Sequence, residues 1–198
     1  MSILTSEDIK QAVQWGEIVM EPYDPLCVNP NSYDVHLGDR IIEVKPNSLS
    51  SDKLQTEIEF GCNDFFYDVA LEPYCKEVFT TKINDVDCFL LKAGCLYLAV
   101  TQEYTESHKH VPYLDGKSSI GRTGLFIHVT AGRGDIGFKG YWTLELVPTM
   151  NMVVYPGMPI GQITWHTVTS IPPQSYDGNY QKQQAEPVPS KIWKWFKK

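Results

Sequence analysis

Residues 78–100, VFTTKINDVDCFLLKAGCLYLAV, consist of short β-branched and aromatic runs separated by turn-forming residues. The runs lie at Val78–Thr81, Cys88–Leu91 and Leu96–Val100, and Asn, Asp and Gly occur between them. Short runs at a spacing of roughly 8–12 residues are typical of all-β barrels and sandwiches. The segment therefore predicts several short strands joined by turns.

Similar runs occur on both sides of this segment. They lie at Phe65–Tyr67, Leu125–Thr130, Tyr141–Val147 and Ile160–His166, and alternating stretches precede them at Ser32–Gly38 and Ile41–Val44. Because so many short strands follow one another, we expect a mainly β fold.

Both ends of the chain have a different pattern. Thr5–Gly16 has hydroxyl and acidic residues at its start and spaced apolar residues after them, which predicts a short N-terminal helix. Pro46–Glu57 has the composition of a surface loop, and Pro, Gln, Asn, Gly and Ser dominate from Ile171 onward. We therefore expect a β domain over residues 1–170 and an extended C-terminal arm over 171–198.

Composition limits the class of protein. The 198 residues carry a net charge of −7, which argues against a general nucleic-acid-binding surface but not against a small phosphorylated substrate. We see no apolar span long enough to cross a membrane and no secretory signal. The odd number of cysteines, widely spaced and without a CxxC pair, favours reduced thiols in the cytoplasm: Cys27, Cys62, Cys75, Cys88 and Cys95.

The residues that could carry chemistry lie within Asp115–Val147, DGKSSIGRTGLFIHVTAGRGDIGFKGYWTLELV. Lys117, Ser118 and Ser119 follow a glycine, so this turn offers a cation, hydroxyls and backbone N–H groups to a phosphate chain. Such a cluster is a weak signal alone, because Ser and Gly gather in any turn. Arg122 is either part of this site or a structural partner for an acid.

Two acids stand out further along. Asp135 lies in a loop with four glycines within nine residues, where it either closes an Asx turn or accepts a hydrogen bond from a sugar hydroxyl. Glu145 lies in the predicted strand 143–147, between Leu144 and Leu146 on the other face. An internal position would raise the pKa of this carboxyl and suit it to proton transfer. The alternatives are an outward-facing residue or a partner for Arg122.

Together, these segments resemble the dCTP deaminase family, including its bifunctional dCTP deaminase/dUTPases. Residues 116–147 are similar to the family core, NSYDVHLG at 31–38 to its x-D-V-x-L-G strand, and YDGNYQKQQ at 176–184 to its C-terminal arm. Residues 1 to about 184 are covered in the right order. Lys117 stands where the family usually has Arg, and Asn179 where it usually has Lys.

The resemblance implies a distorted jelly-roll, dUTPase-like barrel that forms a homotrimer with active sites between subunits and the arm closing over the nucleotide. Glu145 would be the proton shuttle, and Ser118 and Arg122 would position it. The remaining matched residues would bind the substrate: Thr130 and Ala131 the pyrimidine, Asp135 the 3′-hydroxyl, and Lys117, Ser119, Tyr176, Asn179 and Gln183 the triphosphate. Mg²⁺ would be held through the phosphates. Zinc is not expected, because the H-x-E and P-C-x-x-C segments of zinc deaminases do not occur.

The expected reaction is conversion of dCTP to dUTP and ammonia, which supplies deoxyuridine nucleotide for dTTP synthesis, with dTTP as a candidate feedback inhibitor. A bifunctional enzyme giving dUMP and pyrophosphate is the first alternative, and a non-catalytic nucleotide-sensing trimer is the second. A plain dUTPase would not need Glu145. The cationic, aromatic segment Lys191–Lys198 lies beyond the family pattern, and packing against the body or a neighbouring subunit is favoured over membrane contact.

Overall fold

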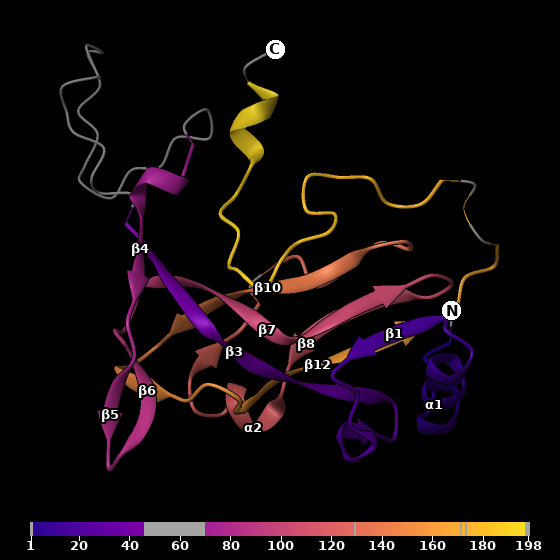
Figure 1. Ribbon diagram of the computed structural model, residues 1–198, viewed down its shortest axis with the longest axis horizontal. Helices are drawn as coiled ribbons and strands as arrows, with labels where there is room; N and C mark the ends of the chain where they lie inside the picture. The colour runs from indigo at the N-terminus through magenta and orange to yellow at the C-terminus, as the bar shows by residue number, and fades with distance from the viewer. Residues whose placement is uncertain (1, 46–69, 129, 171, 173, 197–198) are drawn as a thin grey trace.

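The computed structural model describes residues 2–45, 70–128, 130–170, 172 and 174–196. The strand expected at Phe65–Tyr67 and the loop expected at Pro46–Glu57 lie outside these residues. Figure 1 shows a β body with α1 (Ser6–Gln14) at its edge and an arm that crosses above β10 (Lys139–Pro148). Within the described residues, no helix is both long and apolar enough to cross a membrane.

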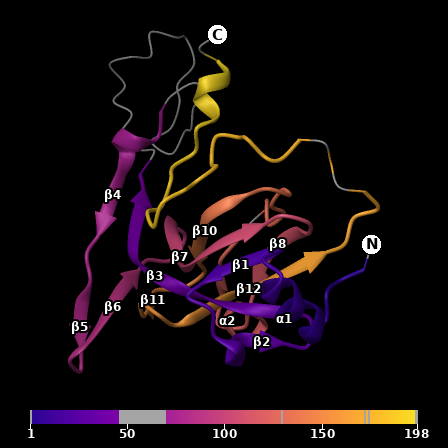
Figure 2. The same cartoon turned by 45° about the vertical axis from the view of Figure 1, so that its right-hand side comes forward.

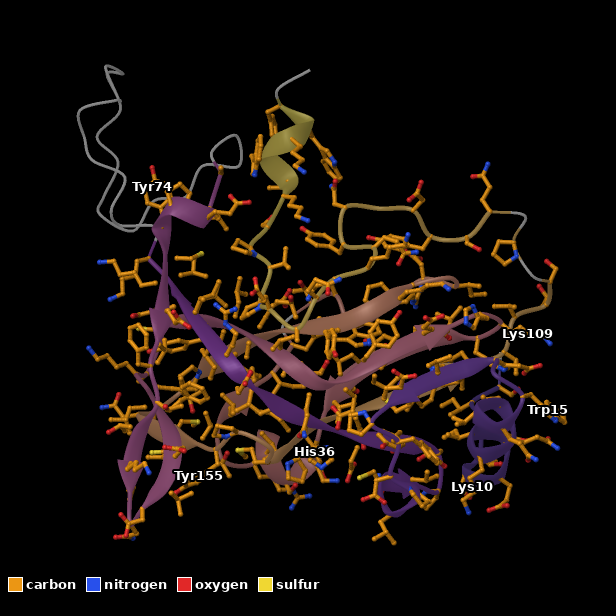
Figure 3. All side chains as sticks on the ribbon, in the orientation of Figure 1. Lys10, Trp15, His36, Tyr74, Lys109 and Tyr155 are labelled. Carbon is orange, nitrogen blue, oxygen red and sulfur yellow. The ribbon has the colours of Figure 1, made fainter. Side chains whose placement is uncertain are left out.

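The predicted N-terminal helix is confirmed as α1 (Ser6–Gln14). Thr5 caps it through a reciprocal pair of bonds with Asp8, since the Thr5 side chain accepts from the Asp8 N–H and the Asp8 carboxylate accepts from the Thr5 N–H. Ile9 and Ala12 face the core, and Trp15 at the end of the helix is exposed. Figure 3 shows Trp15 at the outer edge of the body, beside Lys10.

The main sheet curls into a nearly closed barrel (Figure 2). Its path is β8-β12-β3-β7-β10-β9, with β1 paired to β7 and with β2 and β4 paired to β3. Nine strands of the described chain form it: β1 (Ile18–Glu21), β2 (Val28–Asn29), β3 (Ser32–Val44), β4 (Cys75–Val78), β7 (Leu96–Ser107), β8 (Val111–Gly116), β9 (Leu125–Phe126), β10 and β12 (Pro159–His166). The mainly β prediction is therefore confirmed.

A smaller sheet stands beside the barrel and has the order β11-β6-β5. It contains β5 (Thr81–Ile83), β6 (Val86–Leu91) and β11 (Met152–Val154). The single strand predicted at Val78–Thr81 is wrong, because β4 pairs with β3 whereas β5 pairs with β6. The chain thus changes sheets at residues 79–80, a switch that its uniform β-branched composition does not reveal.

Alternation along the strands builds the core. In β10 the residues alternate between buried and half-buried, and Leu144 and Leu146 are fully buried with Ile160 and Ile163 of β12. Complete burial of one such side chain stabilises the fold by about 1.5–3 kcal/mol. The barrel interior is therefore the main source of stability, as Figure 3 illustrates by the side chains between its strands.

The strand predicted at Leu125–Thr130 is shorter than expected. β9 ends at Phe126, and the chain then leaves β10 and approaches β8, where the Gly132 carbonyl accepts from the Leu114 N–H at 2.7 Å. A Cβ at Gly132 would lie 2.3 Å from the Leu114 oxygen, so this approach requires glycine. The segment closes the gap between the two ends of the sheet instead of extending one of them.

A polar network ties β7 to the start of β10. Glu106 accepts a hydrogen bond from the Tyr104 hydroxyl and forms ion pairs with His108 and Lys139. Burial of Glu106 alone would raise its pKa, but the hydrogen bonds from Lys139 and Tyr104 outweigh it and hold the pKa below the ordinary value of 4.5. Burial, together with the bond to Glu106, raises the pKa of Tyr104 to about 12.

The C-terminal arm docks on β10, and the structure places no strand in its described residues. The Gln183 carbonyl accepts from the Tyr141 N–H at 3.1 Å, and the Lys139 carbonyl accepts from the Lys182 N–H at 2.8 Å. The Gln183 amide also donates to the Thr143 hydroxyl, which accepts a second bond from the Val188 N–H. These bonds fix the arm along the strand that carries Glu145.

Candidate functional site

A cavity of about 820 Å³ lies between β10, the glycine-rich segment and the arm. Its volume is within the usual range for small-molecule sites. One wall is apolar and includes Val44, Leu71, Leu96 and Leu98. Six of the substrate-site residues expected from the sequence line it: Thr130, Ala131, Asp135, Glu145, Tyr176 and Gln183.

Glu145 reaches the cavity because of strand alternation. Thr143, Glu145 and Val147 all line the cavity, while Leu144 and Leu146 point into the barrel core behind it. Of the internal and outward-facing positions that the sequence left open, the structure shows neither fully, because the Glu145 side chain lies on the cavity wall and is 36% exposed in the single chain. Its backbone N–H donates to the Ile127 carbonyl at 3.0 Å, which holds β10 against the segment opposite.

His128 is a cavity residue that sequence reasoning did not select. Its Nδ1 lies 3.6 Å from a carboxylate oxygen of Glu145, and its side chain is 11% exposed. Both ring nitrogens are buried and have no hydrogen-bond partner among the described residues. The sequence carries no signal for this contact, since the pairing of Ile127 with Glu145 that places His128 beside the carboxylate is seen only in the structure. The cavity lining thus includes a Glu–His pair.

Arg133 also lines the cavity and was not among the predicted site residues. It forms an isolated β-bridge with Tyr113 of β8, and Asp135, two residues further along the chain, also lines the cavity. Asp135 itself is exposed, and its carbonyl accepts from the Phe138 N–H at 3.1 Å. The cavity therefore carries both a cation and an anion from one short loop.

Gln181 fastens this glycine-rich loop to the arm. Its amide group donates to the carbonyls of Gly137 and Tyr176, and its amide oxygen accepts from the Lys139 N–H. Gly137 has φ +90°, and a Cβ there would lie 2.6 Å from Ser175. The close contact between loop and arm thus depends on both residues, and sequence reasoning had assigned Gln181 no role.

The predicted phosphate turn lies outside the cavity. Lys117 precedes α2 (Ser118–Gly121), and Ser118, Ser119 and Arg122 are exposed. Figures 1 and 2 place α2 on the opposite side of the barrel from the arm. In one chain, the structure therefore does not bring these residues together with Glu145.

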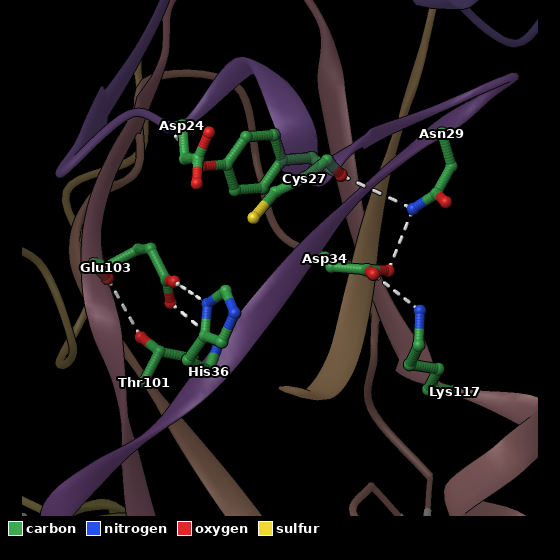
Figure 4. Close-up of polar contacts among 9 residues, drawn as sticks. Asp24, Cys27, Asn29, Asp34, His36, Thr101, Glu103 and Lys117 are labelled. Atoms are coloured by element: carbon green, nitrogen blue, oxygen red, sulfur yellow. Dashed lines mark hydrogen bonds and ion pairs between the residues drawn. The ribbon is translucent and has the colours of Figure 1, made fainter. Parts of the chain in front are cut away.

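Lys117 is held on the barrel wall by its own partners. Its ammonium donates to Asp34, whose other oxygen accepts from Asn29 at 2.8 Å. Figure 4 shows this chain of contacts beside a second one, in which Glu103 accepts from both the backbone and the ring of His36. Lys117 thus has a fixed position despite its flexible side chain.

The three arm residues expected to bind triphosphate have different surroundings. Tyr176 lines the cavity and packs against Phe138, with ring centroids 6.1 Å apart. Gln183 is buried, and its side-chain amide is bonded to Thr143. The Asn179 side chain is exposed and does not line the cavity.

Comparison with known proteins identifies close relatives. A family model described as dCTP deaminase-like matches residues 3–168. Proteins named "dCTP deaminase, dUMP-forming" from Cytophaga hutchinsonii and Leptospira biflexa are each 39% identical over 196 residues, which is 99% of both chains. A protein of the same name from Clostridium beijerinckii is 36% identical over 198 residues, again 99% of both chains.

A solved structure shares the fold. The crystal structure of 2′-deoxycytidine 5′-triphosphate deaminase from Agrobacterium tumefaciens matches with a TM-score of 0.58 at 22% identity. The match covers 84% of this chain and 48% of that one, so this chain spans about half the length of that neighbour. The likeness agrees with the expected dUTPase-like barrel.

Proposed function

Because the chain belongs to the dCTP deaminase-like family, we propose that it deaminates dCTP and releases dUMP. Water replaces the 4-amino group, which leaves as ammonia, and a second water cleaves the bond between the α- and β-phosphates to give dUMP and pyrophosphate. The names of the relatives, all dUMP-forming, favour this bifunctional reaction over the dUTP product expected from the sequence.

The observation that carries the proposal is the Glu145 carboxylate on the cavity wall, 3.6 Å from His128. Glu145 takes a proton from a water molecule that attacks C4 of the cytosine ring. It then returns protons to the ring and to the departing amino group. A carboxylate beside a histidine, in a cavity of nucleotide size, has the groups that this proton transfer needs.

The rest of the cavity orients the nucleotide. In the proposed complex, backbone groups of Thr130 and Ala131 contact the pyrimidine edge, and Asp135 accepts from the 3′-hydroxyl. Tyr176 lies at the arm side of the sugar and phosphates. The Gln183 amide anchors the arm to β10, since Thr143 already accepts its hydrogen bond.

The phosphate turn enters the proposal from a second copy of the chain. Lys117, Ser118, Ser119 and Arg122 do not line the cavity of their own chain, although the reaction requires cations near the triphosphate. In a homotrimer, each cavity would receive the phosphate turn of a neighbouring chain. The turn would then lie beside the Glu145 of another chain, although it is separated from the Glu145 of its own. Ser118 and Arg122 then position Glu145 and the base, and Lys117 and Ser119 bind the phosphates.

Mg²⁺ is part of the proposal as an ion carried with the triphosphate. In the proposed complex the ion binds mainly through phosphate oxygens, where it neutralises part of their charge. The proton transfer assigned to Glu145 requires no zinc.

Product analysis tests the proposal directly. The protein with Mg²⁺ and dCTP should release ammonia, pyrophosphate and dUMP, which chromatography separates from dUTP. Glu145→Gln should abolish ammonia release and leave nucleotide binding largely intact, whereas the control Glu77→Gln, on β4 and 46% exposed, should keep full activity. Accumulating dUTP would indicate a deaminase alone, and unchanged dCTP with bound nucleotide would favour a nucleotide-sensing trimer.

A further inference from the structure

Lys191 lies where the C-terminal segment leaves the cavity. Val188 and Ser190, just before it in the chain, line the cavity together with Tyr180. The Lys191 backbone N–H donates to the Tyr180 hydroxyl at 3.1 Å, and its ammonium lies 5.5 Å from the centre of the same ring. These two contacts hold the lysine against a side chain that forms the cavity wall.

The Lys191 ammonium also reaches the backbone of the arm. It donates to the Asn179 carbonyl at 2.8 Å. An ammonium has three N–H donors, and this bond uses one of them. The cation is thus fixed by a carbonyl and an aromatic ring, neither of which neutralises its charge.

Charge balance explains why a cation is needed there. The charged cavity residues are Arg133, Asp135 and Glu145, which carry two negative charges and one positive charge when ionised. A triphosphate brings several more negative charges, and the Lys117 of the same chain is bonded to Asp34 outside the cavity. Besides the phosphate turn of a neighbouring chain, a cation on the segment that follows the arm would favour a polyphosphate that enters from the arm side.

We infer that Lys191 supplies this cation and binds the nucleotide's polyphosphate at the rim of the cavity. The inference rests on the proposed function. Asn179 is neutral, so it cannot supply the positive charge of the lysine that the family usually has at this position. The Lys191 ammonium donates a hydrogen bond to the Asn179 carbonyl and so lies beside that position. The segment after the arm thus contributes to substrate binding and is more than a packing element.

Steady-state kinetics on four variants test the assignment. Lys191→Met should raise the KM for dCTP about tenfold, the loss expected for one charge-assisted hydrogen bond, with little change in kcat. Lys191→Arg should keep most of the affinity, and Asn179→Lys combined with Lys191→Met should restore part of it. Lys194→Met is the matched control, because Lys194 lies in the same segment but over the ring of Trp193, which does not line the cavity, and not over that of Tyr180, which does.

Two outcomes would overturn the inference. One is an unchanged KM in a folded Lys191→Met protein, and the other is an equal loss in Lys191→Met and Lys194→Met. If the unaltered protein converts no dCTP, the proposed function fails, and titration calorimetry of dCTP with Mg²⁺ then decides the Lys191 inference separately. A Kd that Lys191→Met leaves unchanged would refute it, and a weakened Kd that Lys191→Arg preserves would support it.

Discussion

Gly140 is the point where the arm lies closest to β10, and Gly140→Ala should release the arm. A Cβ at this position would lie 2.7 Å from the Gln183 nitrogen and 2.9 Å from its carbonyl oxygen. Both neighbours are backbone atoms, so neither can rotate away. The glycine also has φ +142°, a conformation that side-chain-bearing residues rarely adopt.

The expected magnitude follows from the bonds that the arm must give up. The Tyr141–Gln183, Lys182–Lys139 and Gln183–Thr143 hydrogen bonds join the arm to β10 beside Gly140. At a net value of about 1 kcal/mol each, their loss lowers the free energy of arm opening by about 3 kcal/mol. Exchange of the amides that they protect should therefore accelerate roughly a hundredfold.

Amide hydrogen exchange of Tyr141 and Lys182 measures this change directly, because both N–H groups donate to the arm contact. Gly16→Ala is the matched control. Gly16 follows α1 outside the cavity lining and has φ +69°, so alanine is strained there too, but nothing lies within 4 Å of its Cβ position. The control should lose overall stability without exposing the arm. The KM for dCTP should rise in Gly140→Ala alone.

Unchanged exchange in a folded Gly140→Ala protein would refute the argument, since the steric clash would then have been absorbed without moving the arm. Equal acceleration in both variants would refute it as well. In that case general destabilisation, and not the contact with Gln183, would explain the effect.

Three other predictions address assembly and stability. Arg122→Ala and Glu145→Gln proteins, each inactive alone, should regain dCTP turnover when unfolded and refolded together, and no recovery would argue against sites shared between subunits. Glu106→Gln should lose stability relative to the unaltered protein above about pH 4.5. The difference should shrink as the pH falls through the lowered folded-state pKa, as followed by thermal unfolding. Glu103→Ala should lower the free energy of unfolding in urea by about 3 kcal/mol, because the N–H groups of His36 lose their buried acceptor; a loss below 1 kcal/mol would contradict this.

The barrel was predictable because its strands alternate. In β10 every second residue is buried, so period and burial agree, whereas in β12 apolar and polar residues alternate only from Ile163 onward, after a register shift near its start. α1 was equally clear from its capping residues. Composition does not show where a strand changes partners, so the switch after Val78 and the early end of β9 appear only in the three-dimensional pairing.

The candidate site was predicted in part. Glu145 and Asp135 were identified because acids in an apolar strand or a glycine-rich loop are conspicuous. His128 and Gln181 were not, since their importance depends on contacts with Glu145 and with the glycine-rich loop, respectively, and these partners are distant in sequence. The location of Arg122 on the far side of the barrel could not be predicted, because proximity in sequence says little about which side of a barrel a turn occupies.

The position of β3 has a consequence for biosynthesis. β3 emerges early from the ribosome and can pair with β4 and β7, but its Tyr33–His36 stretch pairs with β12, more than a hundred residues later. Until β12 has been translated, this stretch of β3 and one edge of β8 lack their partner strand, and such edges readily pair with other molecules. Pairings between distant segments also form slowly. We therefore expect nascent chains that stall before Pro159 to aggregate, and the barrel to close only after synthesis is nearly complete.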